Sequence, residues 1–193
     1  MPETCRLFIA IPLPNQVKQT LQDVQKLLKR DNHPVRWVAP NAMHLTLQFL
    51  GETNVNLLPQ INDVLQHVVN QRVSHTLVLE APGVFPHLCR PSVIWVGVGG
   101  ATEPLIQLQA TLARALESLG FTREARPFFA HLTIGRVRRD ATGEQQEQLG
   151  RAISALPPIS PVSWQVTQIM LFQSELLQSG PRYTERYAVE LPG

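Results

Sequence analysis

Apolar residues occur along the chain with two different spacings, which follow one another. Short apolar runs at Arg6–Leu13 and Val93–Gly100 are typical of buried strands. After each run, apolar residues recur every three or four positions, over Asn15–Arg30 and Thr102–Glu117, and this spacing predicts amphipathic helices. The pattern therefore predicts a protein that combines strands and helices.

These elements recur at a constant offset of 87 residues. Further segments that keep the offset are the helical patterns Leu58–Gln71 and Gln145–Pro158, the alternating patterns His75–Glu80 and Val162–Thr167, and the pair Phe85 and Phe172. We interpret the chain as one domain of residues 1–193 that contains an internal repeat, roughly 6–85 and 93–172. The alternative is two ordinary α+β units that share a short motif by chance.

The same tetrad, His-Leu-Thr followed by an apolar residue, occurs in both copies. It begins at His44 in the first copy and at His131 in the second. Because side chains alternate between the two faces of a strand, each histidine is expected to share a face with Thr46 or Thr133, two residues on. The apolar residues of each tetrad are expected on the opposite, buried face, and Phe49 with them.

Two copies of one unit tend to pack about a pseudo-twofold axis. The sequence therefore predicts a bilobal, duplicated α+β fold, with two antiparallel sheets flanked by helices around a central cleft. The two tetrads are expected to face each other across that cleft. The remaining histidines are interpreted as ordinary core or surface residues: His33, His67, His75 and His87.

Composition indicates the cellular setting. The chain has 193 residues, of which 44% are hydrophobic and 17% charged, as expected of a soluble globular protein. It has no apolar run of about 18 residues and no signal-peptide pattern, so we expect no membrane partner. Cys5 and Cys89 lack paired spacing and are interpreted as reduced thiols. We expect a cytoplasmic protein that works as a monomer.

Basic residues gather around the second tetrad. Residues 123–139 contain five arginines and one glutamate, although the net charge of the whole chain is only +2. Arginine outnumbers lysine 14 to 3, and its guanidinium group is the better bidentate partner for phosphate. The alternative is that these arginines form a solvated basic loop. Their position around the second tetrad favours a site for an anionic substrate.

Two histidines and two threonines facing each other suit acid–base chemistry at phosphorus. Histidine titrates near pH ~6.5, so one ring can act as base while the other acts as acid. The threonine hydroxyls can donate hydrogen bonds to the non-bridging oxygens of a phosphate. Neither tetrad contains a carboxylate, so we expect no metal and no other cofactor. A zinc site that uses both histidines and a distant third ligand stays open as an alternative.

The two tetrads within a duplicated chain resemble the 2H phosphoesterase superfamily, and in particular its bacterial and archaeal RNA 2′,3′-cyclic phosphodiesterases, also called 2′-5′ RNA ligases. Four segments in order carry the resemblance: RLFIAIPLP, VRWVAPNAMHLTLQFLGE, RPFFAHLTIGR and LFQSELLQSGPRY. Ala130 departs from the family pattern, which often has proline before the second histidine. Proline would only stiffen the start of the strand, so we expect the departure to leave activity intact.

The resemblance implies a bilobal α+β fold and metal-independent hydrolysis of a terminal RNA 2′,3′-cyclic phosphate to a 2′-phosphomonoester. It implies that His44 is the proton donor and His131 the proton acceptor, an order that the near-symmetry of the two copies leaves open. Run backwards with an RNA 5′-hydroxyl as nucleophile, the same site would make a 2′-5′ linkage. Hydrolysis is expected to dominate in dilute solution, because water is the abundant nucleophile.

The repeat is broken at Arg136, which aligns with Phe49. The family places a phosphate-contacting arginine at Arg136, although strict alternation would turn this side chain away from the His131 face. Gly135 would permit a bulge that brings it back. Further candidate substrate contacts, from aromatic stacking and charge near the tetrads, are Phe8, Trp37, Arg126 and Phe128.

Two other functions compete with this hypothesis. A non-catalytic module that binds RNA ends would keep the threonines and Arg136 but would not need both histidines. A phosphodiesterase for a small cyclic nucleotide would use the same four tetrad residues. The basic segment favours an RNA with a 2′,3′-cyclic phosphate terminus as the substrate.

Overall fold

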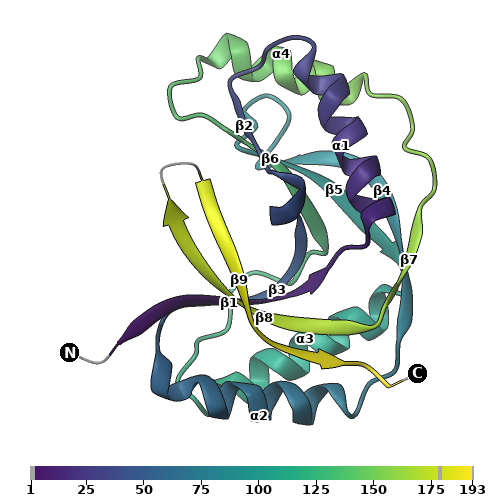
Figure 1. Ribbon diagram of the computed structural model, residues 1–193. Coiled ribbons are helices and arrows are strands. Elements are labelled where there is room, and N and C mark those ends of the chain that lie inside the picture. Colours follow the sequence, from purple (N-terminus) through teal and green to yellow (C-terminus); the bar gives the residue numbers. More distant parts are fainter. Residues whose placement is uncertain (1–2, 178–179, 193) are drawn as a thin grey trace.

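The computed structural model describes residues 3–177 and 180–192, which form two antiparallel sheets (Figure 1). The ends of the predicted domain 1–193, and residues 178–179 within the segment LFQSELLQSGPRY, lie outside the described residues. The first sheet has the order β3-β1-β8-β9. Its strands are β1 (Thr4–Pro12), β3 (His44–Asn54), β8 (Gln168–Leu177) and β9 (Gly180–Glu190).

The second sheet has the order β2-β6-β5-β4-β7. Its strands are β2 (Val35–Trp37), β4 (His75–Phe85), β5 (Val93–Gly100), β6 (His131–Val137) and β7 (Ser163–Val166). All strand pairs in both sheets are antiparallel. Each tetrad thus begins a strand, β3 in one sheet and β6 in the other, and the predicted α+β class is confirmed.

Two helices cover the outer face of each sheet (Figure 1). The β3-β1-β8-β9 sheet carries α2 and α3, and the other sheet carries α1 and α4. Within the described residues the helices are α1 (Asn15–Lys29), α2 (Leu58–Val69), α3 (Thr102–Glu117) and α4 (Gly143–Ser154), and 3₁₀ turns occur at Pro40–Ala42 and Val55–Leu57. These positions agree with the four predicted helical segments to within a few residues.

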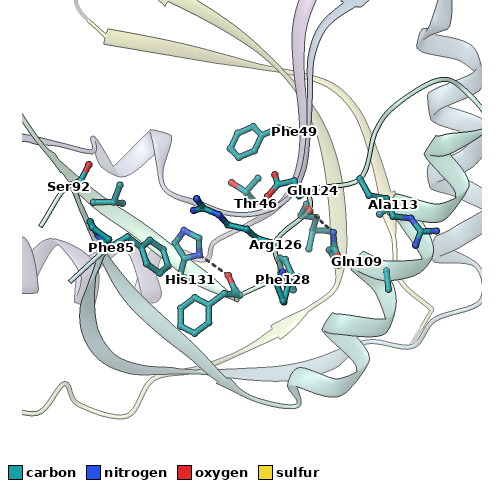
Figure 2. A pocket seen from close by; sticks show the side chains of 17 residues that line it. Thr46, Phe49, Phe85, Ser92, Gln109, Ala113, Glu124, Arg126, Phe128 and His131 are labelled. Atoms are coloured by element: carbon teal, nitrogen blue, oxygen red, sulfur yellow. Dashed lines mark hydrogen bonds between the residues drawn. The ribbon is translucent and has the colours of Figure 1, made fainter. Parts of the chain in front are cut away.

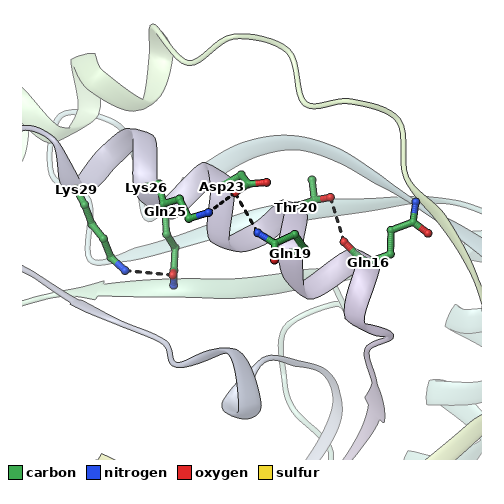
Figure 3. Close-up of polar contacts among 7 residues, drawn as sticks. All are labelled: Gln16, Gln19, Thr20, Asp23, Gln25, Lys26 and Lys29. Carbon is green, nitrogen blue, oxygen red and sulfur yellow. Dashed lines mark hydrogen bonds and ion pairs between the residues drawn. The ribbon is translucent and has the colours of Figure 1, made fainter.

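The helix α1 shows why the apolar periodicity predicted a helix. Val17, Leu21 and Leu28 are buried against the sheet, while the polar residues on the other side form local contacts in water (Figure 3). Among these, Lys26 Nζ lies 2.7 Å from Asp23 Oδ1, an exposed pair that adds little stability. Gln25 departs from the pattern, because it is polar and only 2% exposed.

Each sheet combines strands from both halves of the sequence. Strand β4, from the first half, pairs with β5 and β7 of the second half. Strand β8, from the second half, pairs with β1 of the first. The helices cross over in the same way, since α1 lies on the sheet of β6 and α3 on the sheet of β3. A spatial lobe therefore differs from a half of the sequence.

Strands β3 and β6 contain an extra residue at equivalent places. In β3 the register to β1 skips Leu47, and in β6 the register to β5 skips Ile134. Such an extra residue forms a β-bulge and turns the following side chains to the other face. The burial patterns of the first six residues of β3 and β6 are accordingly identical: the first and third positions are half-buried, the sixth is exposed, and the others are buried.

Candidate active site

A cavity of about 520 Å³ between the two sheets is lined by both tetrads. His44 and Thr46 reach it from β3, and His131 and Thr133 reach it from β6. Leu45 is fully buried behind its strand, as the alternation of faces predicts. The structure therefore brings the four predicted tetrad residues together in one space.

The ring of His131 is held through one nitrogen. Its Nδ1 lies 2.8 Å from the backbone oxygen of Phe129. A carbonyl oxygen only accepts hydrogen bonds, so Nδ1 carries the proton and donates it, which leaves Nε2 as the nitrogen that gains or loses a proton. The backbone of Ala42 contacts His44 in the corresponding way, also two residues before the histidine.

Aromatic rings contact both histidines, and they come from corresponding positions of the two copies. Phe8 packs on His44 with ring centroids 4.7 Å apart, and Phe172 lies 6.3 Å from His44. Across the cavity, Phe85 meets His131 edge-on at 5.1 Å and Trp95 lies at 6.4 Å. Phe8 and Trp95, like Phe85 and Phe172, are separated by 87 residues. The offset found in the sequence thus relates the surroundings of the two rings.

Burial makes His44 a weak base. Removal from water lowers the pKa of His44 to about 4, and the backbone hydrogen bond to Ala42 offsets this only in part. The neutral ring is therefore the form favoured by the site near pH 7. A phosphate anion placed beside the ring would favour the charged form and raise this pKa again.

The cavity is positively charged. Arg6 and Arg136 both line it, and among its described lining residues there is no carboxylate. Tyr183 also lines the cavity, and its ring is edge-on to the His44 ring at 5.3 Å. Burial raises the pKa of the Tyr183 hydroxyl, while the charges of Arg136 and Arg6 partly offset this rise, so the phenol keeps its proton and can donate a hydrogen bond.

The bulges decide the positions of Arg136 and Phe49. The extra residue Ile134 returns Arg136 to the face of His131, and Arg136 lines the cavity. The bulge at Leu47 does the same for Phe49, so the expectation that Phe49 lies on the buried face is wrong. Its side chain is 54% exposed and lines the cavity, because the register shift reverses the alternation after Leu47.

A second cavity, of about 870 Å³, adjoins the first and shares Thr46, Phe49 and His131 with it. Two further predicted residues, Arg126 and Phe128, line this second cavity, and Phe8 lines the first. Figure 2 shows the Arg126 side chain directed into the space beside Thr46 and His131.

Trp37 lies outside the lining of both cavities. It pairs with Gly135 across β2 and β6, and its ring packs over the space that Gly135 leaves open. The Lys29 ammonium group of α1 lies 5.5 Å from the ring centroid, on the helix-covered side of the sheet. The predicted stacking role of Trp37 in the cleft is therefore not supported, because its ring lies on the α1 side.

Sequence reasoning gave no role to Arg6, Tyr183 or Ser174, which also line the first cavity. All three residues do lie within the segments that carried the family resemblance. Their positions depend on strand order: β8 pairs with β1, and β9 then brings Tyr183 beside Phe8, at 4.9 Å between ring centroids. A pattern within one segment does not contain this information.

Comparison with known proteins identifies the family. The model of the 2′-5′ RNA ligase superfamily matches residues 12–176. The chain belongs to this superfamily. An RNA 2′,3′-cyclic phosphodiesterase of Thermotoga maritima is 33% identical over 189 residues, which cover 97% of this chain and 96% of the relative.

Solved structures of other proteins share the fold. A protein of Thermus thermophilus superposes with a TM-score of 0.82 at 27% identity, over 97% of this chain and 98% of the other. Escherichia coli LigT, in a crystal structure with 3′-AMP, gives a TM-score of 0.76 at 27% identity, over 98% and 99% of the two chains. The bilobal architecture expected from the resemblance is therefore confirmed.

Within residues 3–177 and 180–192, no three histidine, cysteine or acidic side chains come together in a group that could hold a metal ion. No helix in these residues is long and apolar enough to cross a membrane.

Proposed function

We propose that this protein is an RNA 2′,3′-cyclic phosphodiesterase, which opens a terminal 2′,3′-cyclic phosphate to a 2′-phosphomonoester without a metal ion. The observation that carries the proposal is the shared cavity, in which two histidines, two threonines and Arg136 meet. The relatives named for this activity, such as that of Thermotoga maritima, add support because the chain matches them over nearly its whole length.

In the proposed reaction His131 is the proton acceptor. Its Nε2 takes a proton from water, and the water oxygen attacks phosphorus. His44 donates its proton to the 3′-oxygen as the bond between phosphorus and that oxygen breaks. The 2′-oxygen keeps its bond, so the product carries a 2′-phosphate and a free 3′-hydroxyl. Each proton transfer of this kind contributes roughly 10²–10⁴-fold to the rate.

The proton donor must be charged before it can act, although burial favours the neutral ring of His44. The substrate itself favours the charged ring, because an anionic phosphate near His44 stabilises the imidazolium form and raises its pKa. Thr46, Thr133 and Arg136 are proposed to donate hydrogen bonds to the non-bridging oxygens, where negative charge increases during the attack. Phe8 is proposed to hold His44 in place and to border the terminal nucleoside.

The proposed substrate is an RNA end, and the proposed setting is the cytoplasm. The basic segment around β6 supports an RNA chain over a mononucleotide. The free thiols of Cys5 and Cys89 support a reducing compartment. A monomer is proposed because one chain supplies both tetrads of the cavity.

The deciding experiment incubates the purified protein with an oligonucleotide that ends in a 2′,3′-cyclic phosphate, in the presence of EDTA, and maps the phosphate of the product. We expect a 2′-phosphate, full activity in EDTA and a bell-shaped pH–rate profile. Activity that EDTA removes and zinc or manganese restores would contradict the metal-free mechanism. Turnover confined to cyclic mononucleotides would favour the small-nucleotide alternative.

A further inference from the structure

The larger cavity opens on one side of the proposed reaction centre only. Its lining includes His131 and Thr46, whereas His44 and Thr133 are absent from its described lining residues. The cavity extends from β3 under the segment 123–129 to the helix α3 (Figure 2). Its volume of about 870 Å³ falls within the range of about 300–1,000 Å³ that is usual for ligand sites.

In-line attack at phosphorus fixes which group occupies which side. The attacking and leaving oxygens lie on opposite sides of the phosphorus atom. With His44 serving the leaving 3′-oxygen, the terminal ribose lies on the His44 side, in the smaller cavity. The nucleophile then approaches from the His131 side, where the larger cavity begins. A water molecule needs only a small part of this volume.

We propose that the larger cavity is a second nucleoside subsite, which binds the 5′-hydroxyl end of another RNA strand as the nucleophile. The inference rests on the proposed phosphodiesterase function and deepens it. Nucleobases stack on aromatic rings. The cavity is lined by four phenylalanine rings that offer such surfaces: Phe49, Phe85, Phe128 and Phe129.

The two arginines that line this cavity differ in how their guanidinium groups are placed for binding a phosphate. Arg123 is engaged by Glu117, with Nη2 2.8 Å from Oε2. The Arg126 side chain points into the cavity beside His131 (Figure 2). It is therefore placed to contact the first phosphate of the entering strand, while its nucleoside stacks on the phenylalanine rings.

The joining step balances in the same way as hydrolysis. His131 takes the proton of the 5′-hydroxyl, and the freed oxygen bonds to phosphorus. The bond between phosphorus and the 3′-oxygen breaks, and His44 gives its proton to that oxygen. The product is a 2′-5′ diester with a free 3′-hydroxyl. His131 ends charged and His44 neutral, and exchange of protons with water resets both.

The experiment fills the larger cavity and leaves the tetrads untouched. Ala110 lies on α3, is exposed, and lines this cavity alone. In Ala110→Trp the indole occupies the space, while Ala110→Ser keeps it open as the matched control. Each variant is tested for hydrolysis of a nucleoside 2′,3′-cyclic phosphate and for joining of an RNA 2′,3′-cyclic phosphate end to a 5′-hydroxyl RNA.

We expect Ala110→Trp to reduce joining by about tenfold or more, the scale of one lost base-stacking contact, and to leave mononucleotide hydrolysis within about twofold of the parent. Ala110→Ser should match the parent in both assays. The parent provides an independent measurement: the rate of joining should saturate with the concentration of 5′-hydroxyl RNA, because a binding site fills.

Three results would overturn the subsite. Mononucleotide hydrolysis that falls in parallel with joining would place the terminal nucleoside in the larger cavity and exchange the two histidine roles. Joining that is equal in Ala110→Trp and the parent, or that rises linearly without saturation, would show that no acceptor binds there. Absence of hydrolysis in the parent would instead remove the proposed function itself.

Discussion

At the scale of single residues, the proposed mechanism assigns the two histidines opposite proton transfers, because His131 accepts a proton and His44 donates one. Each is the only titrating group of its tetrad, so loss of either one removes one proton transfer. We predict that His44→Ala and His131→Ala each lose roughly 10²–10⁴-fold in rate, with unchanged circular dichroism. The double variant should be little worse than either single variant, because the pair acts as a unit. A near-normal rate in either single variant would contradict the mechanism.

Arg136 and Phe49 occupy equivalent positions after the two bulges, and the structure changes what is expected of Phe49. Arg136→Lys loses the bidentate fork, and one charge-assisted hydrogen bond is worth about 1.5–3 kcal/mol, so binding of a phosphate-containing product should weaken roughly 10- to 100-fold. The dissociation constant and the rate at low and high salt check this prediction. An Arg136→Ala variant equal to the parent in both would show that the arginine is only solvated.

Phe49→Arg is the reciprocal change. Because Phe49 is 54% exposed, it can be replaced without opening a hole in the core. We therefore predict a change in the free energy of unfolding within about 0.5 kcal/mol, measured by urea denaturation. The buried neighbour Leu47, replaced by Ala, should cost about 2–5 kcal/mol in the same measurement. Equal losses in both variants would place Phe49 in the core after all.

The lowered pKa of His44 makes stability depend on pH. Above pH ~6.5 both the folded and the unfolded state hold a neutral ring, and His44 contributes nothing. As the pH falls toward 4, the His44 ring binds a proton in the unfolded state but stays neutral in the folded state, so the free energy of unfolding decreases. At pH 5 this loss amounts to about 2 kcal/mol.

Urea denaturation at pH 7.5 and pH 5 tests this dependence. We predict that His44→Asn loses less stability than the parent between these two values, by about 1–2 kcal/mol. His67→Asn, which removes an exposed ring on α2, is the matched control and should follow the parent. The same pH dependence in His44→Asn as in the parent would show that His44 titrates normally.

At the scale of elements, the bulge of β6 is held by a glutamine of the helix that crosses it. The Gln25 amide donates to the backbone oxygens of Ile134 and Val38, both at 2.8 Å. Ile134 is the extra residue of the bulge, and the bulge is what turns Arg136 into the cavity. In the other sheet Gln109 of α3 makes a longer contact, 3.4 Å, to the backbone oxygen of Leu47.

We predict that Gln25→Leu costs about 1–3 kcal/mol in the free energy of unfolding, because the partly buried Val38 oxygen loses its donor. Activity should fall mainly through KM, since the loosened bulge displaces Arg136 rather than either histidine. Gln19→Leu, on the water-facing side of α1 (Figure 3), is the control and should change neither quantity. An unchanged KM in Gln25→Leu would separate the bulge from substrate binding.

At the scale of the whole molecule, the exchange of β4 and β8 between the sheets makes the halves of the chain interdependent. A fragment of residues 1–90 has β1 and β3 but lacks β8, and its β4 lacks both β5 and β7. We predict that this fragment alone shows no cooperative thermal transition, and neither does 91–193. Mixing the two should restore phosphodiesterase activity. Cooperative unfolding of either fragment would contradict this interdependence.

Local pattern by itself determined the elements of this protein and indicated the chemistry that is proposed for its site. The 3.6-residue spacing of Val17, Leu21 and Leu28 specifies a helix because one face must be buried, and the alternation in the tetrads separates His and Thr from Leu for the same reason. The internal repeat of residues 6–85 and 93–172 stays a prediction, supported by the equal bulges and by the aromatic pairs at the same offset.

Tertiary structure decided which side chains face the cavity, because the local sequence pattern does not specify this. Whether Arg136 and Phe49 face the cavity depends on one extra residue in each strand, which is visible only in the register to the partner strand. Trp37 lies in a polar stretch of the sequence, which suggested that its ring could stack on the substrate. Its pairing with Gly135 instead turns the ring toward α1. Tyr183 reaches His44 because β8 and β9 join the sheet of β1. These positions follow from hydrogen bonds between distant segments, and no single segment of the sequence encodes them.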